Sequence, residues 1–141
     1  MKSRERMIYD DEYYRKRQTL VIKSKLPDLN SYINTERSNK FAAHQLKKKA
    51  TRAVQHEINL QISKFKVKKF KRIYLYIDYY CKDKRKDMDN VAFAKKFILD
   101  GMVNAKVIPN DGWKQIAGWE ERFYIDKNNP RIEILLVEPA D

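Results

Sequence analysis

Two aspartates, Asp87 and Asp89, stand two residues apart directly after a stretch that is typical of a β-strand, residues 72–81. On extended backbone, side chains two residues apart point to the same face, and their Cα atoms are about 6.5–7 Å apart. Two such carboxylates can bind one hard cation, and Mg²⁺ usually takes one or two carboxylates together with water and substrate phosphate. A third carboxylate, Asp111, follows. The pattern predicts a Mg²⁺ site.

This acidic group lies in a strongly basic chain. Among 141 residues, Lys and Arg number 31 against 19 Asp and Glu, which gives a net charge of +12. Neutralisation of phosphates by Lys and Arg drives most non-specific nucleic-acid binding, so nucleic acid is the expected partner, and a basic membrane-surface protein is the alternative. An acidic cluster in such a chain indicates a Mg²⁺-dependent enzyme that acts on a polyanion.

Other classes are disfavoured by composition. No apolar run approaches the roughly 20 residues needed to span a bilayer, and the first residues lead into no apolar segment of the signal-peptide type. We therefore expect no membrane partner. The one cysteine leaves no internal disulfide framework and suits a reducing cytoplasm. His44 and His56 are too few for a His-rich metal site, and no small-molecule cofactor is expected.

The chain is long enough for one domain with an ordinary core. Residues 1–17 are charged and show no clear period, so we interpret them as an extension or a peripheral helix, and place the domain at 18–141. Within it, a first strand is expected at 18–25. A turn follows at 26–30, because proline and the Asp and Asn beside it favour turns. An irregular loop that faces the ligand is expected at 31–38.

The remaining elements follow from hydrophobic periodicity. Helices are expected at 39–62 and 90–104, the second capped by Asp89 or Asn90. The strand at 72–81 is apolar on both faces, which is typical of a central strand.

Two more strands, at 113–126 and 130–138, look like a pair joined by a turn. The expected fold is therefore an α/β (α+β) single domain, with a mixed sheet of about four strands and two main helices.

The chain carries Asp-Met-Asp-Asn at 87–90, Lys-Lys-Phe-Ile-Leu-Asp-Gly-Met at 95–102 and Val-Ile-Pro-Asn-Asp at 107–111. These runs resemble the RusA family of small, dimeric, Mg²⁺-dependent Holliday junction resolvases, which are common in bacteriophages and prophages. The segment at 26–32 is similar to the early proline-containing loop of that family, so the resemblance covers about residues 19–138.

The resemblance implies that Asp87, Asp89 and Asp111 are catalytic carboxylates that bind the metal, and that Lys96 is the catalytic lysine. The stretch before Lys96 is about three residues longer than in the best-known member of the family, so Lys95 competes for that role. The family often has two adjacent aspartates where this chain has Asn and then Asp111.

DNA contact is expected from basic residues beside the carboxylates and from the basic face of the first helix, for which a solvated surface is the alternative reading. The expected DNA-binding residues are Lys82, Lys84, Arg85, Lys86, Asn90, Arg37, Lys40, Lys47 and Lys48. Trp113 and Trp119 could stack on bases, but we favour packing in the core or at an interface.

The acidic cluster in a basic chain predicts a Mg²⁺-dependent nuclease, with Mn²⁺ as a substitute for Mg²⁺. The resemblance further implies an endodeoxyribonuclease that resolves four-way DNA junctions by paired symmetrical nicks during recombination and repair. It also implies 5′-phosphate and 3′-hydroxyl ends and a homodimer, expected in the cytoplasm of a bacterial host. A two-fold dimer matches the two cleavage points of the junction. The alternatives are a nuclease for flaps, forks or other branched DNA, an RNA-processing nuclease, and a non-catalytic basic module that binds nucleic acid.

Overall fold

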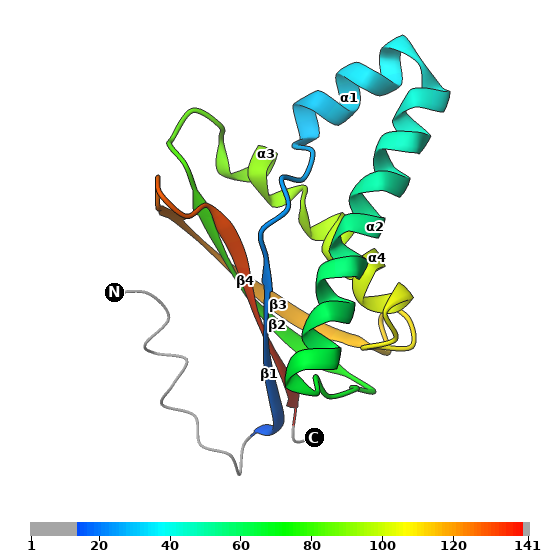
Figure 1. Cartoon of the computed structure of the whole chain (residues 1–141), viewed down its shortest axis with the longest axis vertical. Helices are drawn as coiled ribbons and strands as arrows, with labels where there is room; N and C mark the ends of the chain where they lie inside the picture. The colour runs from blue at the N-terminus through cyan, green and yellow to red at the C-terminus, as the bar shows by residue number, and fades with distance from the viewer. Residues whose placement is uncertain (1–13, 140–141) are drawn as a thin grey trace.

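The structure is a computed structural model that describes residues 14–139 (Figure 1). In chain order the elements are β1 (Tyr14–Ile22), α1 (Leu29–Ser38), α2 (Lys40–Phe65), β2 (Ile73–Cys81), α3 (Met88–Ala92), α4 (Lys95–Asn104), β3 (Ile116–Ile125) and β4 (Arg131–Pro139). None of these helices is long and apolar enough to cross a membrane.

Four strands form one mixed sheet in the order β1-β4-β2-β3 within the described residues. β4 is antiparallel to both of its neighbours, whereas β2 and β3 are parallel. Parallel neighbours need a crossover connection, and here α3 and α4 supply it. The prediction of a mixed α+β domain with a four-stranded sheet is confirmed, and β2 is a central strand as its two apolar faces indicate.

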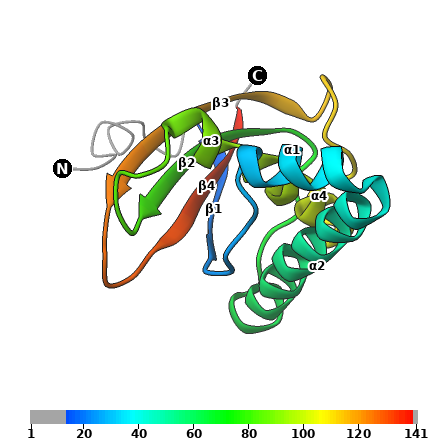
Figure 2. The ribbon, with the colours of Figure 1, turned by 90° about the horizontal axis from the view of Figure 1, so that it is seen from above.

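The helices cover one face of this sheet (Figure 2). Alternate residues of the strands point into the layer between sheet and helices, where they meet the apolar stripes of α2 and α4. The strands contribute Leu20, Ile22, Ile73, Leu75, Ile77, Tyr79, Ile134 and Leu136, and the helices contribute Ala50, Val54, Ile58, Phe97, Ile98 and Met102.

Helices α2 and α4 approach each other closely at Gly101. A Cβ atom added there would lie 2.5 Å from Cγ1 of Val54 and 3.2 Å from the backbone nitrogen of Gln55. A side chain at this position would therefore push α4 away from α2, because Val54 is fully buried. Glycine at position 101 sets the distance between the crossover helix and the helix beside it.

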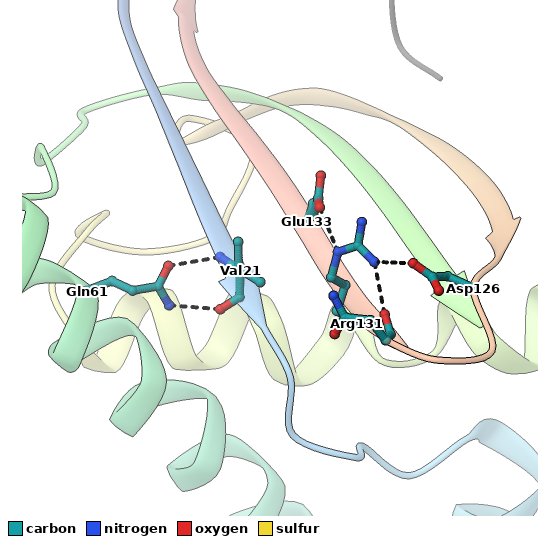
Figure 3. Close-up of polar contacts among 6 residues, drawn as sticks. Val21, Gln61, Asp126, Arg131 and Glu133 are labelled. Atoms are coloured by element: carbon teal, nitrogen blue, oxygen red, sulfur yellow. Dashed lines mark hydrogen bonds and ion pairs between the residues drawn. The ribbon is translucent and has the colours of Figure 1, made fainter. Parts of the chain in front are cut away.

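The edge strand β1 is held to α2 by side chains (Figure 3). The side-chain amide of Gln61 accepts a hydrogen bond from Val21 N–H at 2.9 Å and donates one to Val21 O at 2.8 Å. One turn earlier, the Glu57 carboxylate accepts from the backbone N–H groups of Lys23 and Ser24 at 2.8 and 2.9 Å. These bonds explain why a carboxylate interrupts the apolar stripe of α2.

Four expectations about the elements differ from the structure. β1 begins at Tyr14, within the stretch of residues 1–17 that was interpreted as an extension; the interpretation of residues 1–13 lies outside the described residues. The loop expected at 31–38 is helix α1. Asp28 caps this helix by accepting from Ser31 N–H at 2.8 Å, and Tyr32 packs against Phe93 at 5.3 Å between ring centroids. The cap, rather than an apolar stripe, marks α1 in the sequence.

The helix expected at 90–104 is instead two helices. α3 begins at Met88 with Asp87 as its N-cap, so neither Asp89 nor Asn90 is the cap. Phe93 and Ala94 then form a tight joint in which Ala94 N–H donates to Val91 O at 3.2 Å, an i→i+3 bond that is typical of a 3₁₀ turn. α4 continues from there with its own apolar stripe.

The two C-terminal strands are not a hairpin, because β2 lies between them. Their connection passes over the end of β2, where Asp126 N–H donates to Cys81 O at 2.8 Å. Arg131 secures this turn: it donates to Asp126 at 2.9 Å and to Glu133 at 2.7 Å (Figure 3). A turn signal in the sequence reports that the chain reverses, but not which strand becomes the neighbour.

Candidate active site

The two aspartates of the motif lie at the start of α3, where the chain leaves the end of β2. Asp87 is the N-cap residue, but its side chain makes no capping hydrogen bond. Asp89 lies in the first turn and accepts from Asn90 N–H at 2.9 Å. The expected extended backbone is therefore wrong for Asp89. Both side chains are exposed, and neither forms an ion pair with any described residue.

The loop that carries these aspartates is tied to the start of α1. Lys86 Nζ lies 2.7 Å from Asp28 Oδ2, and Asn30 N–H donates to Asn90 Oδ1 at 2.9 Å. Burial raises the pKa of Asp28, but hydrogen bonds from Lys86 and Ser31 outweigh it and hold that pKa below its usual value. Asn90, one of the expected DNA-binding residues, is buried, and its side chain accepts the hydrogen bond that ties the loop to α1.

Four of the basic residues expected to contact DNA lie on the loop that leads from β2 to the carboxylates. Lys82, Lys84 and Arg85 are exposed on the loop between β2 and α3, and Arg85 lies 3.6 Å from Asp83 in a surface ion pair. Lys86 is half-exposed while it contacts Asp28. The loop therefore presents exposed positive charge in the same solvent-facing segment as the two carboxylates of the motif.

A cavity of about 510 Å³ lies beside this loop, between it and the segment that joins β1 to α1. Its walls include Leu26, Val91 and Ala94, and Cys81 and Ile132 of the sheet also line it. The sequence offered no sign of this cavity, because its walls come from four separate segments.

Asp111 lies at the other end of the crossover. It lines a groove together with Asp100 and Asn104 of α4 and with Lys47 and Lys48 of α2. The whole crossover, α3 and α4 with the joint between them, lies between it and Asp87 along the chain. Between residues 14 and 139, no group of three His, Cys, Asp or Glu side chains is arranged to hold a metal ion. A single copy of the chain therefore does not bring Asp111 to Asp87 and Asp89.

The two candidate lysines have different surroundings. Lys95 Nζ lies 3.1 Å from Glu121 Oε1 and 4.2 Å from the centroid of the Trp119 ring, so it is held against β3. Lys96 is half-exposed and lies 3.6 Å from Asp100 in an i,i+4 ion pair. Of the two, Lys96 is the more accessible to a ligand. It lies in the first turn of α4, beyond the joint that separates this helix from Asp89 on α3.

A buried polar network under α4 was missed by the sequence reasoning. Tyr79 donates to Glu121 Oε2 at 2.6 Å, and the same carboxylate binds Lys95. Burial and the hydrogen bond to Glu121 raise the pKa of Tyr79 far above its usual value, so it stays protonated. The available signal was an acidic residue on the same face of β3 as Trp119 and Phe123, but its partners lie on two other elements.

The other expected contacts lie at the surface. Arg37, Lys40 and Lys48 are exposed, and Lys47 is half-buried. Trp113 is 97% exposed, so it does not pack in the core of this chain. Trp119 is 46% exposed and takes part in the contact with Lys95.

The residues at the start of α3 fit a divalent cation in part. Mg²⁺ needs one or two carboxylates, with water and substrate phosphate completing its oxygen ligands, and the exposed Asp87 and Asp89 supply two in one short segment. The third expected ligand is remote within the chain. No protein-family model matches the sequence, and a comparison with curated proteins finds no significant match.

Proposed function

We propose that the protein is a Mg²⁺-dependent endonuclease that cuts branched DNA, with the four-way junction as its substrate. The strongest support comes from the loop before α3, where Asp87 and Asp89 are exposed inside a basic segment and have no cationic partner among the described residues. Carboxylates that only faced DNA would weaken its binding by repelling phosphate. Carboxylates that hold a cation would instead attract phosphate.

In this proposal Asp87 and Asp89 hold the ion from the protein side. Bound Mg²⁺ would polarise the phosphoryl oxygen and activate water. Lys82, Lys84 and Arg85 bind the phosphates on either side of the scissile bond, where their charges lie next to the carboxylates along the chain.

Asp111 belongs to this site only through a second copy of the chain. β3 is an edge strand of the described sheet and runs parallel to β2. If two copies pair their β3 edges antiparallel about a two-fold axis, the start of β3 in one chain lies beside the end of β3 in the other. That end is where β2 also finishes, just before Asp87. A dimer of this kind would direct Asp111 of one chain towards the acidic pair of its partner.

The direct test is cleavage of a labelled four-way junction and a matched linear duplex, with Mg²⁺ and with EDTA. We expect paired symmetrical nicks in the junction alone, and only with Mg²⁺. Asp87→Asn and Asp89→Asn should abolish cleavage and keep junction binding, whereas Glu36→Gln, a change of the same chemistry on the exposed surface of α1, should cleave normally. Full activity of both aspartate variants would refute the assignment of the metal ligands.

Mixing two inactive variants tests the shared site. A dimer of one Asp87→Asn chain and one Asp111→Asn chain would contain one site with both changes and one with neither. Equimolar mixing should therefore restore nicking of one strand, by the intact site. If both residues serve the same protomer's site, every site in the mixed dimer carries one change and the mixture stays inactive.

Substrate choice separates the remaining functions. Equal cleavage of Y-shaped forks or flaps would favour a broader nuclease for branched DNA. Tight, salt-sensitive junction binding with no cleavage in Mg²⁺ or Mn²⁺ would favour a non-catalytic binding module.

A further inference from the structure

The cavity beside the acidic loop has an apolar lining. Leu26 of the β1–α1 segment, Val91 of α3 and Ala94 of the joint face it together with Ile22 and Ile132 of the sheet. At about 510 Å³, it falls within the range of roughly 300–1,000 Å³ that is usual for small-molecule sites. An apolar lining of this size favours a ligand with a flat or apolar body.

The polar residues that line the cavity carry an excess of positive charge. Its two carboxylates are already matched, since Asp28 contacts Lys86 and Asp83 contacts Arg85. Arg131 also lines it and is paired with Asp126 and Glu133. The remaining cations of the lining are Lys23, Lys25 and Lys82, whose ammonium groups contact no carboxylate among the described residues. The cavity therefore suits a ligand that combines an apolar body with more than one negative charge.

The walls are formed before any ligand arrives. Glu57 holds the backbone of Lys23 and Ser24, and the contact between Asp28 and Lys86 joins the two segments across the cavity. Lys86 lines the cavity and is followed directly by Asp87, so their Cα atoms are about 3.8 Å apart. A ligand that contacts Lys86 is therefore one residue along the chain from Asp87, although neither aspartate lines the cavity itself.

We propose that this cavity takes one unstacked nucleotide of the branched DNA, with its base against the apolar lining and its phosphates on Lys23, Lys25 and Lys82. The inference rests on the proposed function for its substrate, but it concerns binding rather than cleavage. Nucleotides at a branch point lack a full set of stacking neighbours, which lowers the cost of extruding one. The cavity would thereby recognise the branch rather than the sequence, and place the adjacent phosphodiester at Asp87 and Asp89.

The test uses four-way junctions that carry the fluorescent base 2-aminopurine either at the branch point or in the middle of an arm, with EDTA present so that cleavage plays no part. Binding of the full-length protein should raise the fluorescence several-fold at the branch point and leave it unchanged in the arm. Val91→Trp and Leu26→Trp, which fill the cavity from opposite walls, should remove the rise. Leu60→Trp, at an exposed position on α2, is the matched control and should keep it.

A second measurement needs no variant. Cys81 is the one cysteine of the chain and lines the cavity, so the rate at which iodoacetamide alkylates it reports whether the cavity is filled. Burial raises the pKa of this thiol, and the reaction is therefore run at mildly alkaline pH, where more thiolate is present. The junction should slow alkylation several-fold, and the linear duplex should not.

The outcomes separate this inference from the proposed function. Mg²⁺-dependent cleavage with neither a fluorescence rise nor protection of Cys81 would overturn the cavity's role and leave the nuclease intact. A rise and protection without cleavage would support the cavity and reject the enzyme. Protection by deoxyadenosine monophosphate but not by the junction would overturn the inference, because the ligand would then be a free nucleotide.

Discussion

Replacing Gly101 by alanine tests whether the contact between α2 and α4 is as close as the structure places it. Helix propensity alone predicts that alanine stabilises the interior of a helix by about 1 kcal/mol relative to glycine. The structure predicts the opposite sign, because the new Cβ would lie 2.5 Å from Cγ1 and 2.9 Å from Cβ of Val54. Val54 cannot easily turn away, since a β-branched side chain in a helix has essentially one rotamer.

The size of the effect follows from these opposing terms. Overpacking of a core costs about 1–3 kcal/mol, and the upper end applies here because Val54 is fully buried. Subtracting the gain in propensity leaves a net loss of about 2 kcal/mol in the free energy of unfolding. For a chain of this length, that lowers Tm by roughly 6 °C.

Urea denaturation of four proteins measures this: the wild type, Gly101→Ala, Val54→Ala and the double variant. Shortening Val54 removes the closest clash, so Gly101→Ala should cost about 1 kcal/mol less in that background. Gly112→Ala is the matched control, because an added Cβ there meets only a side-chain oxygen at 3.5 Å, and it should be nearly neutral. A Gly101→Ala protein as stable as the wild type, or strictly additive costs, would refute the close approach.

Further predictions concern single side chains. Asp28→Ala should lower stability by about 1–2 kcal/mol through loss of the cap of α1. The pKa of Asp28 is lowered in the folded state, so its charge stabilises the fold fully above about pH 5 and less as pH falls through the lowered pKa. The difference in the free energy of unfolding between wild type and Asp28→Asn, measured in urea melts, should therefore shrink as pH falls. Glu121→Gln should lower stability in urea melts by about 1–3 kcal/mol, because it removes the charge that pairs with Lys95 and weakens the bond from Tyr79; unchanged stability would contradict these contacts. Gln61→Ala should speed hydrogen exchange of the Val21 amide, because that N–H donates to the side chain of Gln61. An unchanged exchange rate would contradict this hydrogen bond.

Hydrophobic periodicity in the sequence predicted much of the fold. The pattern at 72–81 predicted a buried central strand, and the structure has β2 there. The long helix and the two C-terminal strands were also predicted close to their observed bounds. α1 was missed because no residue in it is buried, so it shows no apolar stripe, and its signal was the cap at Asp28.

Sheet order was the main part that local patterns could not supply. The loop between β3 and β4 indicated a hairpin, but pairing depends on which strands bury each other's apolar faces, and β2 is the neighbour of both. The missing sheet order also explains why the position of Asp111 was not predicted. Once β2 and β3 are known to be parallel, the residues after one and before the other must lie at opposite ends of the sheet. Spacing in the sequence placed Asp87 and Asp89 together but carried no information about that separation.

The position of β4 has a consequence for how the chain is made. Among the strands of the described sheet, β1 is synthesised before the others, and it hydrogen-bonds with β4, which is synthesised after them. Until β4 is synthesised, β1 and the inner edge of β2 both expose unpaired backbone groups, which invite pairing with other chains. The sheet therefore closes only after β4 has been synthesised, and a chain truncated before Arg131 should aggregate rather than form a smaller version of the domain.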